Sequence, residues 1–367
     1  MVGEQRQATM ADVAREAGVS ASTVSRALRG VPTVSPETRS RVERAARELS
    51  FVLSRSASSL VTGKTHRVAV MIPDIPRAPW FLGNALTAIA EVLREAELDL
   101  LVYVVGNKSE RAAFFDRLPA RRNADALMVV SFILTQEERE RLDELGVPVV
   151  YVSQHAADRA SVYIDDAEGA RKGIQHLLNL GHRRIAHLQS AVVESFAWSA
   201  HDRLTGYRQA LEDAGLPYDE SLVVCTESSR QGIREGVGAL LSLPQMPTAV
   251  FVETDEMAFE VLSVLRSCGI DVPGRMSVLG FDDHSLAEAL DLSTVAQSAW
   301  RTGRIAAELV TSILTDPSAD PTRHVVLPTH LVPRGSTSPP LREGRAETAV
   351  AAQQAARPAG SAGNTNS

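Results

Sequence analysis

The sequence predicts an all-α helix-turn-helix head followed by an α/β two-lobed core, in which each lobe is a doubly wound parallel sheet. Two observations carry this prediction. Residues 9–30 hold two short amphipathic helical patterns separated by a glycine. From residue 66 onward, short runs of β-branched and other apolar residues alternate with segments that have the 3.6-residue period of helices. Parallel strands that are buried on both faces give such runs, so an α/β core is expected.

The first helix of the head starts after Thr9, whose hydroxyl can accept a hydrogen bond from a free amide of the first turn. Asp12 stands at the position of a capping-box partner, where the helix dipole also favours an anion. Gly18 supplies the left-handed residue that ends the helix. The apolar residues that share one face at helical spacing are Met10, Val13, Ala14 and Ala17.

The second helix runs from Ala21 to Arg29 behind the cap residue Ser20. Its outward face is small and polar at the start and cationic further along. The inward residues are Val24, Ala27 and Leu28, and the outward residues are Ala21, Ser22, Ser25, Arg26 and Arg29. A helix that begins with small residues can approach base edges in the major groove, where arginine reads the N7 and O6 acceptors of guanine. The pattern therefore indicates a DNA-recognition helix.

A third helix completes the head. Ser35 caps it, and Pro36 takes the first helical position, where the missing N–H of proline has no cost. The residues that close a three-helix core are Val42, Ala45, Ala46 and Leu49. The alternative is an ordinary helical hairpin with polar faces, for which so dense a set of start and stop signals is unusual.

These residues resemble the DNA-binding domain of the lactose-repressor/galactose-repressor family of bacterial transcription regulators. In that family a short hinge helix follows, and a leucine from it wedges into the central base step of the operator from the minor groove. Here residues 51–65 occupy the hinge position, with Leu60 as the wedge and Ala57 beside it. The family usually has Pro-Asn where this chain has Leu53-Ser54, although Ser54 can still touch a phosphate. The alternative is that Leu60 is only an apolar linker residue.

The resemblance implies a homodimer that binds a pseudo-palindromic operator. The implied DNA contacts come from Thr9, Met10, Ser20, Ala21, Ser22, Ser25, Arg26, Arg29, Thr38, Ser54, Ala57 and Leu60. Among them, Ala21, Ser22, Arg26 and Arg29 are expected to read bases, and Ser20, Ser25 and Thr38 to touch phosphates.

Charge is divided unevenly along the 367 residues of the chain. Residues 1–65 carry ten Lys and Arg against six Asp and Glu, a net of +4, whereas the remaining 302 residues carry 28 against 39, a net of −11. A basic segment on an acidic protein is typical of local contact with phosphates. No segment approaches the ~18 consecutive apolar residues of a membrane span, and the first residues lack the order of a secretion signal. A cytoplasmic, nucleoid-associated protein without a membrane partner is therefore expected.

The core shows two series of predicted strands. The first series is residues 67–72, 99–105, 126–132 and 148–152, with helical segments around 82–96, 109–118 and 136–145. The second series is residues 184–189, 222–225, 248–252 and 276–281, separated by helices that start near Ala167, Arg203, Gly232 and Glu256. Doubly wound lobes bind ligands at the C-terminal ends of their strands, so the ligand is expected between the two lobes.

The core resembles the body of the same family, which is similar to periplasmic sugar-binding proteins. Phrases such as NLGHRRIAHL at 179–188 and VPGRMSVLGFDD at 272–283 carry this likeness. It implies that the chain crosses between the lobes near Asp165, Gln297 and Arg323. The expected domains are 1–50 for the head, 51–65 for the hinge helix and linker, and 66–338 for the core, with 66–164 and 298–323 in the N-lobe, 165–297 and 324–338 in the C-lobe, and a disordered tail at 339–367.

Two residues match the effector-binding arginine and aspartate of the family. Arg203 begins a predicted helix, and its planar guanidinium can clamp adjacent hydroxyls or a carboxylate. Asp282 directly follows a predicted buried strand. Their alternatives are a surface helix cap and a turn residue. Trp80 and Phe81 are expected to stack on a sugar ring, although core packing suits Phe81 as well. The other expected ligand residues are Ser153, Trp198, Thr254 and Gln297.

Departures from the family's pattern leave the ligand class open. Ser153 stands where many members have an aspartate, Thr254 where many have an asparagine, and Ala78 in place of the first residue of an Asn-Pro-Phe-Phe phrase. A sugar or sugar derivative is the expected effector, and a smaller or more apolar ligand is the alternative. No cofactor is expected.

Other functional classes fit the sequence less well. No GxGxxG, P-loop, HExxH or GxSxG motif indicates an enzyme, and a transport-binding protein has no use for a DNA-binding head. Cys225 and Cys268 lack metal-like or redox spacing and are expected to be buried thiols. The tail lacks the leucine heptads of a tetramer, so a dimer is expected. The sequence therefore predicts a transcriptional regulator, a repressor, whose operator affinity is switched by a small ligand between the lobes.

Overall fold

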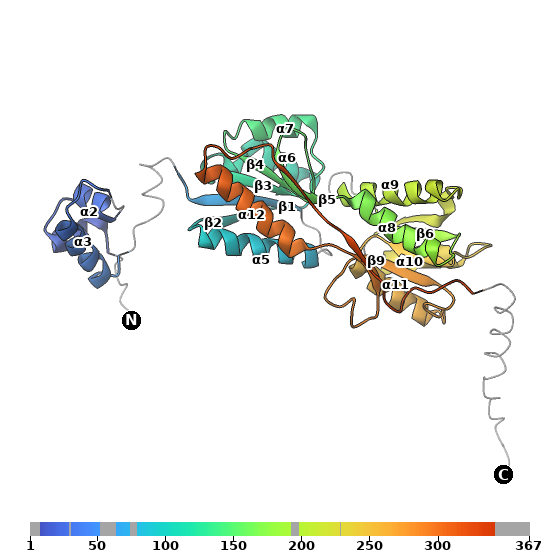
Figure 1. The fold of residues 1–367 in the computed structure, drawn as a ribbon. Coiled ribbons are helices and arrows are strands. Elements are labelled where there is room, and N and C mark those ends of the chain that lie inside the picture. Colours follow the sequence, from blue (N-terminus) through green and yellow to red (C-terminus); the bar gives the residue numbers. More distant parts are fainter. Residues whose placement is uncertain are drawn as a thin grey trace, which may run out of the picture. The chain divides into compact units, whose positions relative to one another are not determined.

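A computed structural model describes residues 8–28, 31–51, 64–73, 79–191, 198–227 and 229–341. The chain divides into two compact units, a helical head and a much larger α/β body (Figure 1). The head unit comprises residues 1–67 with 122–125, and the body unit comprises 68–121 with 126–367. None of the described helices is long and apolar enough to cross a membrane.

The head consists of the three expected helices, α1 (Met10–Ala17), α2 (Ala21–Leu28) and α3 (Pro36–Glu48). Thr9 and Asp12 form the capping box of α1, and Gly18 ends that helix in the left-handed region with a φ of 64°. Because the apolar stripes of all three helices meet, they bury one small core. Its buried residues are Val13, Ala14, Ala17, Val24, Ala27, Val34, Val42, Ala45 and Ala46.

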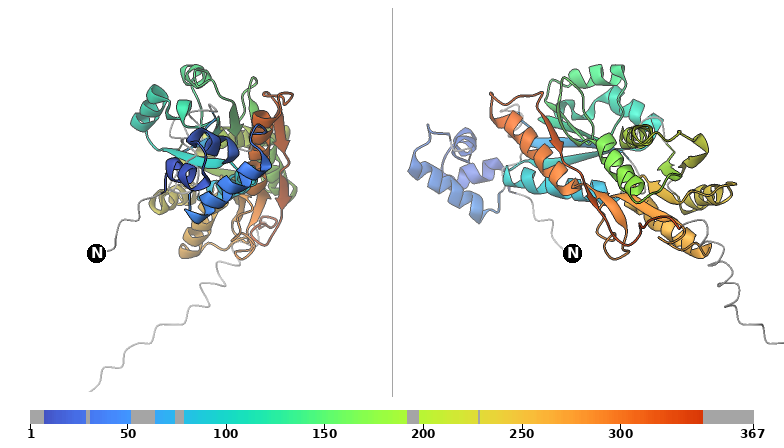
Figure 2. Two further views of the ribbon diagram at one scale, coloured as in Figure 1. Left: turned by 90° about the vertical axis from the view of Figure 1, so that its left-hand side faces the viewer. Right: turned by 45° about the vertical axis from the view of Figure 1, so that its right-hand side comes forward.

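The N-lobe of the body is built on a six-stranded sheet with the order β11-β5-β4-β3-β1-β2. Its strands are β1 (Arg67–Pro73), β2 (Asp99–Val105), β3 (Ala126–Val130), β4 (Val149–Val152), β5 (Ala160–Ile164) and β11 (His324–Leu327). Its helices are α5 (Pro79–Glu95), α6 (Lys108–Arg117), η1 (Pro119–Arg122), α7 (Gln136–Asp143) and α12 (Ala299–Thr315). Helices α5 and α12 are packed side by side, although one follows β1 and the other comes late in the chain (Figure 2).

The C-lobe repeats this plan with the strand order β12-β10-β9-β8-β6-β7. Its strands are β6 (Ile185–Ser190), β7 (Val223–Thr226), β8 (Ala249–Val252), β9 (Ser277–Asp282), β10 (Ser293–Ala296) and β12 (His330–Val332). Its helices are α8 (Asp166–Asn179), α9 (Trp198–Asp213), η2 (Glu220–Leu222), α10 (Arg230–Leu241) and α11 (Asp255–Ser267). The last strand, β12, is antiparallel to β10, so this sheet is not wholly parallel.

The chain passes between the two sheets three times, after β5, after β10 and after β11. Residues 324–327 are expected from the sequence to belong to the C-lobe, and this boundary is wrong. Val325 and Val326 pair in parallel with β5, so the last crossover follows Leu327 rather than Arg323. The orange-red segment of Figure 1 shows this passage from one lobe to the other.

Three further expectations from the sequence are corrected by the structure. Strand β2 is an edge strand rather than one buried on both faces, with Val102 and Val104 exposed. Cys225 and Cys268 are exposed rather than buried. Arg203 lies in the second turn of α9, which begins earlier, at Trp198. Apolar composition alone does not distinguish an edge strand from a central one, because both need one buried face.

Close helix packing in the C-lobe places the candidate site. A Cβ on Gly206 of α9 would lie only 2.1 Å from the carbonyl oxygen of Ala167 in α8, so only glycine permits this approach. The two helices consequently touch near the first turn of α8. Arg203, about one turn before Gly206, therefore faces Asp166, the first residue of α8.

Candidate functional site

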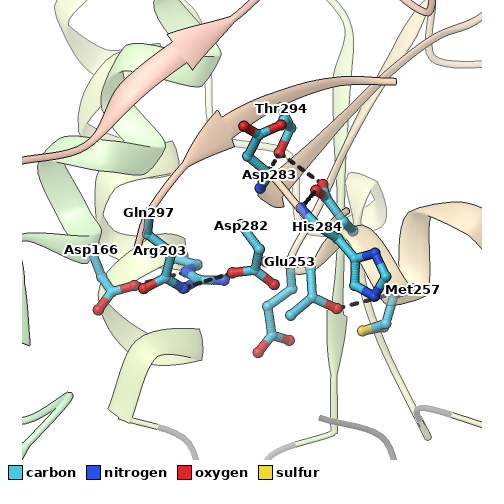
Figure 3. Close-up of polar contacts among 11 residues, drawn as sticks. Asp166, Arg203, Glu253, Met257, Asp282, Asp283, His284, Thr294 and Gln297 are labelled. Atoms are coloured by element: carbon cyan, nitrogen blue, oxygen red, sulfur yellow. Dashed lines mark hydrogen bonds and ion pairs between the residues drawn. The ribbon is translucent and has the colours of Figure 1, made fainter. Parts of the chain in front are cut away.

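Arg203 is the centre of a buried polar network at the C-terminal edge of the C-lobe sheet (Figure 3). Only 3% of the residue is exposed. Its Nε donates to Oδ1 of Asp166 at 2.8 Å, and its Nη1 donates to the backbone carbonyl of Glu253 at 2.5 Å. Its Nη2 forms an ion pair with Oδ1 of Asp282 at 3.8 Å. The guanidinium is thus held by three different segments of the lobe.

An aromatic ring fixes the plane of this guanidinium. The Cζ of Arg203 lies 3.6 Å from the centre of the Phe281 ring. Phe281 is the second-to-last residue of strand β9. Burial works against the charge of Arg203, but Asp166 and Asp282 raise its pKa above the ordinary value. Arg203 therefore stays charged and oriented, with most of its donors directed at the protein itself.

Asp282 ends strand β9 and adopts a left-handed backbone with a φ of 123°. A non-glycine residue in this region is strained and persists only where its surroundings hold it. The amide Nε2 of Gln297 donates to Oδ1 of Asp282 at 2.7 Å. Burial raises the pKa of Asp282 to about 6, whereas Arg203 and Gln297 act in the opposite direction. The structure thus brings together Arg203, Asp282 and Gln297, three of the expected ligand residues.

A second carboxylate, Asp255, is fully buried behind Asp282. It opens α11 and accepts hydrogen bonds from the backbone N–H of His284 and from Oγ1 of Thr294, both at 2.8 Å. Burial and the charge of Asp282 raise the pKa of Asp255 to about 8. The chain makes room for this carboxylate with Gly280, because a Cβ there would lie 2.0 Å from Oδ1 of Asp255.

Glu253 supplies a further buried carboxylate on the same edge, just after strand β8. Its Oε2 accepts from the backbone N–H of Ser190 at 2.5 Å and from the Ser190 hydroxyl at 2.7 Å. Sequence reasoning missed Asp166, Glu253 and Asp255. Glu253 and Asp255 follow a buried strand as Asp282 does, so the rule that singled out Asp282 would also have found them.

The other expected ligand residues take different places. Trp80 and Phe81 open α5 in the N-lobe, and Phe81 packs partly buried against the hydrophobic core. Ser153 follows strand β4 with a φ of 56°. Thr254 is the N-cap of α11 and accepts from the backbone N–H of Met257. The side chain of Trp198 lies outside the described residues.

Trp80 contacts the opposite lobe. Its indole lies 5.6 Å, between ring centres, from the imidazole of His284, which follows strand β9 in the C-lobe. Burial also raises the pKa of Glu256 on α11 to about 7, and the nearby backbone N–H of Trp80 acts in the opposite direction. His284 and Glu256 are further residues that the sequence did not single out.

Two surface hollows lie away from this network. One of about 320 Å³ is lined by α8 residues such as Arg171 and His176, and the other, of about 520 Å³, lies beside α11 and includes Phe259 and Leu290. Arg203, Asp282 and Gln297 line neither hollow.

No group of metal-ligating side chains is found in the described part of the chain. His187 stacks between Tyr207 and Phe251 and hydrogen-bonds the Phe251 carbonyl, and burial lowers its pKa to about 4. His182 bridges Thr248 and the carbonyl of Ser338. His187 therefore packs in the core, and His182 binds the C-terminal segment.

The outward face of α2 carries the expected DNA-reading residues. Ser20, Ala21, Ser22 and Arg26 are exposed, and Ser25 is half-buried. The Ser20 hydroxyl accepts from the backbone N–H of Thr23, which makes it the cap of α2. Thr9 is exposed, and Met10 and Thr38 are half-buried. Arg29, Ser54, Ala57 and Leu60 lie outside the described residues.

Models of known protein families match both the head and the body of the chain. Residues 9–54 match the model of the bacterial regulatory proteins of the lacI family, and residues 174–337 match a periplasmic binding protein-like domain. The chain is 34% identical to the regulator CelR of Thermobifida fusca over 346 residues, which cover 90% of this chain and 99% of CelR.

Two solved structures share the fold. A CelR–cellobiose complex has a TM-score of 0.66 and 31% identity, over 90% of this chain and 99% of that one. The lac repressor dimer bound to operator and the anti-inducer ONPF has a TM-score of 0.80 and 23% identity, over 91% and 100% of the two chains, and supports the fold alone.

A helix-turn-helix head joined to a two-lobed binding body defines a ligand-responsive, DNA-binding class of protein. The chain belongs to the lacI family of bacterial regulatory proteins. It is a transcriptional regulator and not an enzyme.

We expect Asp255→Asn to change how thermal stability depends on pH. The pKa of Asp255 is about 8 in the folded chain, above its ordinary value of 3.8, so folded Asp255 holds a proton that the unfolded chain releases. Its contribution to the free energy of unfolding therefore falls as pH rises from about 4 to about 8. Calorimetry should show the Tm of the parent, relative to the variant, decreasing across this range. Asp116→Asn, an exposed change on α6, is the control, and a pH-independent difference for Asp255→Asn would contradict the assignment.

Proposed function

We propose that the chain is a repressor that binds a pseudo-palindromic operator as a homodimer and responds to a neutral, hydroxyl-rich effector held between the lobes. The observation that carries this proposal is the Arg203 network at the C-terminal edge of the C-lobe sheet. The place of action that we propose is the nucleoid, in the cytoplasm. The proposed domains are the head, the hinge at 51–65 and the two lobes, with the last crossover after Leu327.

The charges of the network support a neutral effector. Asp166, Glu253, Asp255 and Asp282 are buried on one edge, and Arg203 is the cation that faces them among the described residues. Arg203 already donates to Asp166 and Glu253, so it has little capacity left for an anionic ligand. Carboxylate oxygens accept hydrogen bonds from hydroxyl groups. A phosphate or carboxylate on the ligand would instead be repelled by these oxygens.

A saccharide is the proposed form of this effector. CelR, the relative described above, is known in a cellobiose complex. In this chain Asp282 and Gln297 form a hydrogen-bonded pair, which can accept from one hydroxyl and donate to another. Trp80 in the N-lobe offers an aromatic ring for the apolar face of a sugar.

The groove beside α11 supports the homodimer. Leu290, which is exposed, and Phe259 line it. Arg266 and Asp271 lie in the same lining, so a second copy related by a two-fold axis can pair each charge with its opposite. We therefore propose that a second copy of this chain covers the groove. Two heads on a two-fold dimer then meet the two halves of a palindrome.

In the head, we propose that Arg26 reads a base. Arg26→Ala should reduce affinity for an operator selected from random DNA more than affinity for unselected DNA, by about 1–3 kcal/mol of discrimination. Fluorescence anisotropy at fixed salt measures both affinities. Arg47→Ala, an exposed arginine of α3, should leave the ratio unchanged. Equal losses on both DNAs for Arg26→Ala would show that this residue contacts only phosphate.

Ligand recognition can be tested with Asp282→Asn, which keeps the size of the side chain and removes its charge. Neutral saccharides that include cellobiose should raise the free energy of unfolding of the parent by mass action, by about 2.7 kcal/mol at a concentration of 100 times Kd, and this gain is measured as a higher Tm. Asp282→Asn should lose this shift, and Asp283→Asn, which breaks only the pair with Arg334, should keep it.

Two outcomes would contradict the proposed effector site. An equal saccharide shift in Asp282→Asn and in the parent would place the ligand elsewhere. A shift with glucose 6-phosphate as large as that with the neutral saccharides would overturn the neutral class while leaving the site itself intact.

If this groove is the dimer face, Leu290→Arg should weaken self-association. Leu290 is 43% exposed at the groove, so the variant would bury an unpaired charge in the interface. Sedimentation velocity over a range of concentrations should show the variant dissociating at concentrations where the parent is a dimer. Val326→Arg, at an exposed position of β11 in the N-lobe, is the control. An unchanged dimer in Leu290→Arg would exclude this groove.

A further inference from the structure

The first free amide of helix α5 is that of Trp80, because Pro79, the first residue of the helix, has no N–H. The residue before the helix in the sequence is Ala78, whose side chain has no hydrogen-bond acceptor. Ala78 therefore cannot cap the helix with its side chain.

Glu256 of the opposite lobe lies in the first turn of α11, and its carboxylate is close enough to the backbone N–H of Trp80 for this group to lower its pKa. Burial and the nearby charge of Asp282 raise the pKa of Glu256 to about 7, and the Trp80 N–H acts in the opposite direction. A carboxylate at this position is also favoured by the dipole of α5. The Glu256 carboxylate is thus placed to act as a cap of α5 from the other lobe.

The Trp80 side chain adds a second contact between the lobes. Its ring lies 5.6 Å from that of His284, with 35° between the planes. His284 is itself fixed, because its backbone N–H donates to Asp255 and its Nδ1 accepts from the backbone N–H of Leu286. The Phe259 ring packs edge-on against its other side at 5.2 Å.

We propose that Trp80, Glu256 and His284 form a clasp that holds the two lobes together and sets how far they close. Both contacts of Trp80 are made by the other lobe, so separation of the lobes exposes the Trp80 N–H and removes the ring from His284. The inference stands whether or not the effector is a saccharide.

The position of the clasp gives it a regulatory consequence. Glu256 lies within electrostatic range of Asp282, so a ligand that binds Asp282 changes the field at the clasp. On the other side, His284 packs on Phe259, which lines the groove beside α11. The clasp therefore connects the candidate effector site with the proposed dimer face, through the charge of Asp282 on one side and the ring contacts of His284 on the other.

The test uses the full chain with Trp198→Phe and Trp300→Phe, which leaves Trp80 as the single tryptophan. Glu256→Ala should shift the Trp80 emission to longer wavelength and increase its quenching by acrylamide, because losing a charge-assisted hydrogen bond changes the closed-to-open ratio about tenfold. Glu260→Ala is the matched control, since Glu260 lies one turn further along α11 and pairs with Arg230 of its own lobe. Emission and quenching that are the same in both variants would overturn the clasp.

The separation of the lobes is measured as the distance between two spin labels, by double electron–electron resonance. Spin labels go on exposed Cys225 in the C-lobe and on Ser109→Cys, an exposed position of α6 in the N-lobe, with Cys268→Ser and an excess of unlabelled chain. Glu256→Ala and His284→Ala should each lengthen or broaden the distance, and Glu260→Ala should not. If Glu256→Ala fails to fold by circular dichroism, Glu256→Gln, which keeps an uncharged acceptor, should give a smaller change in the same direction. A distance distribution identical to that of the parent in the folded variants would refute the proposal.

Discussion

The buried guanidinium of Arg203 is the interaction on which the candidate site depends. Carboxylates lose much hydration free energy on burial, and an unpaired buried charge typically costs several kcal/mol. Arg203 offsets this cost for Asp166 and Asp282 and also binds the carbonyl of Glu253. Because the three partners come from α8, β9 and the end of β8, one side chain fixes the relative positions of three segments. Its first role is therefore to organise the site, and contact with a ligand comes second.

Protonation of the buried carboxylates adds to the charge balance that the single cation, Arg203, provides. Burial raises the pKa of Asp255 to about 8 and of Asp282 to about 6, so protons share the task of balancing the carboxylates. Hydrogen bonds from Gln297 and Thr294 act on the ionised forms. The result is an edge rich in acceptors and poor in free cations among the described residues. The basic head, with its net of +4, has the opposite character, and this separation keeps phosphate attraction away from the ligand-binding body.

Sequence reasoning reached the head almost completely, because its signals are local. A capping hydroxyl at Thr9, a left-handed glycine at Gly18 and a proline at the start of α3 each act within one helical turn. In the body, the rule for strand ends found Asp282 and the family pattern found Arg203, but both left Asp166 unnoticed. Asp166 becomes a partner only because Gly206 lets α9 approach α8. Trp80 illustrates the same limit, since its contacts with Glu256 and His284 join segments about 180 and 200 residues apart.

The sequence by itself determined the helix-turn-helix, the alternation of strands and helices, the family and the class of function, since periodicity, caps and motifs are properties of neighbouring residues. Tertiary structure alone decided that β11 belongs to the N-lobe, that β2 is an edge strand, and that Arg203 is occupied by its own carboxylates. Sheet order and ion pairing depend on which distant segments pack together, and that choice is made by the whole buried core, which no short stretch of sequence contains.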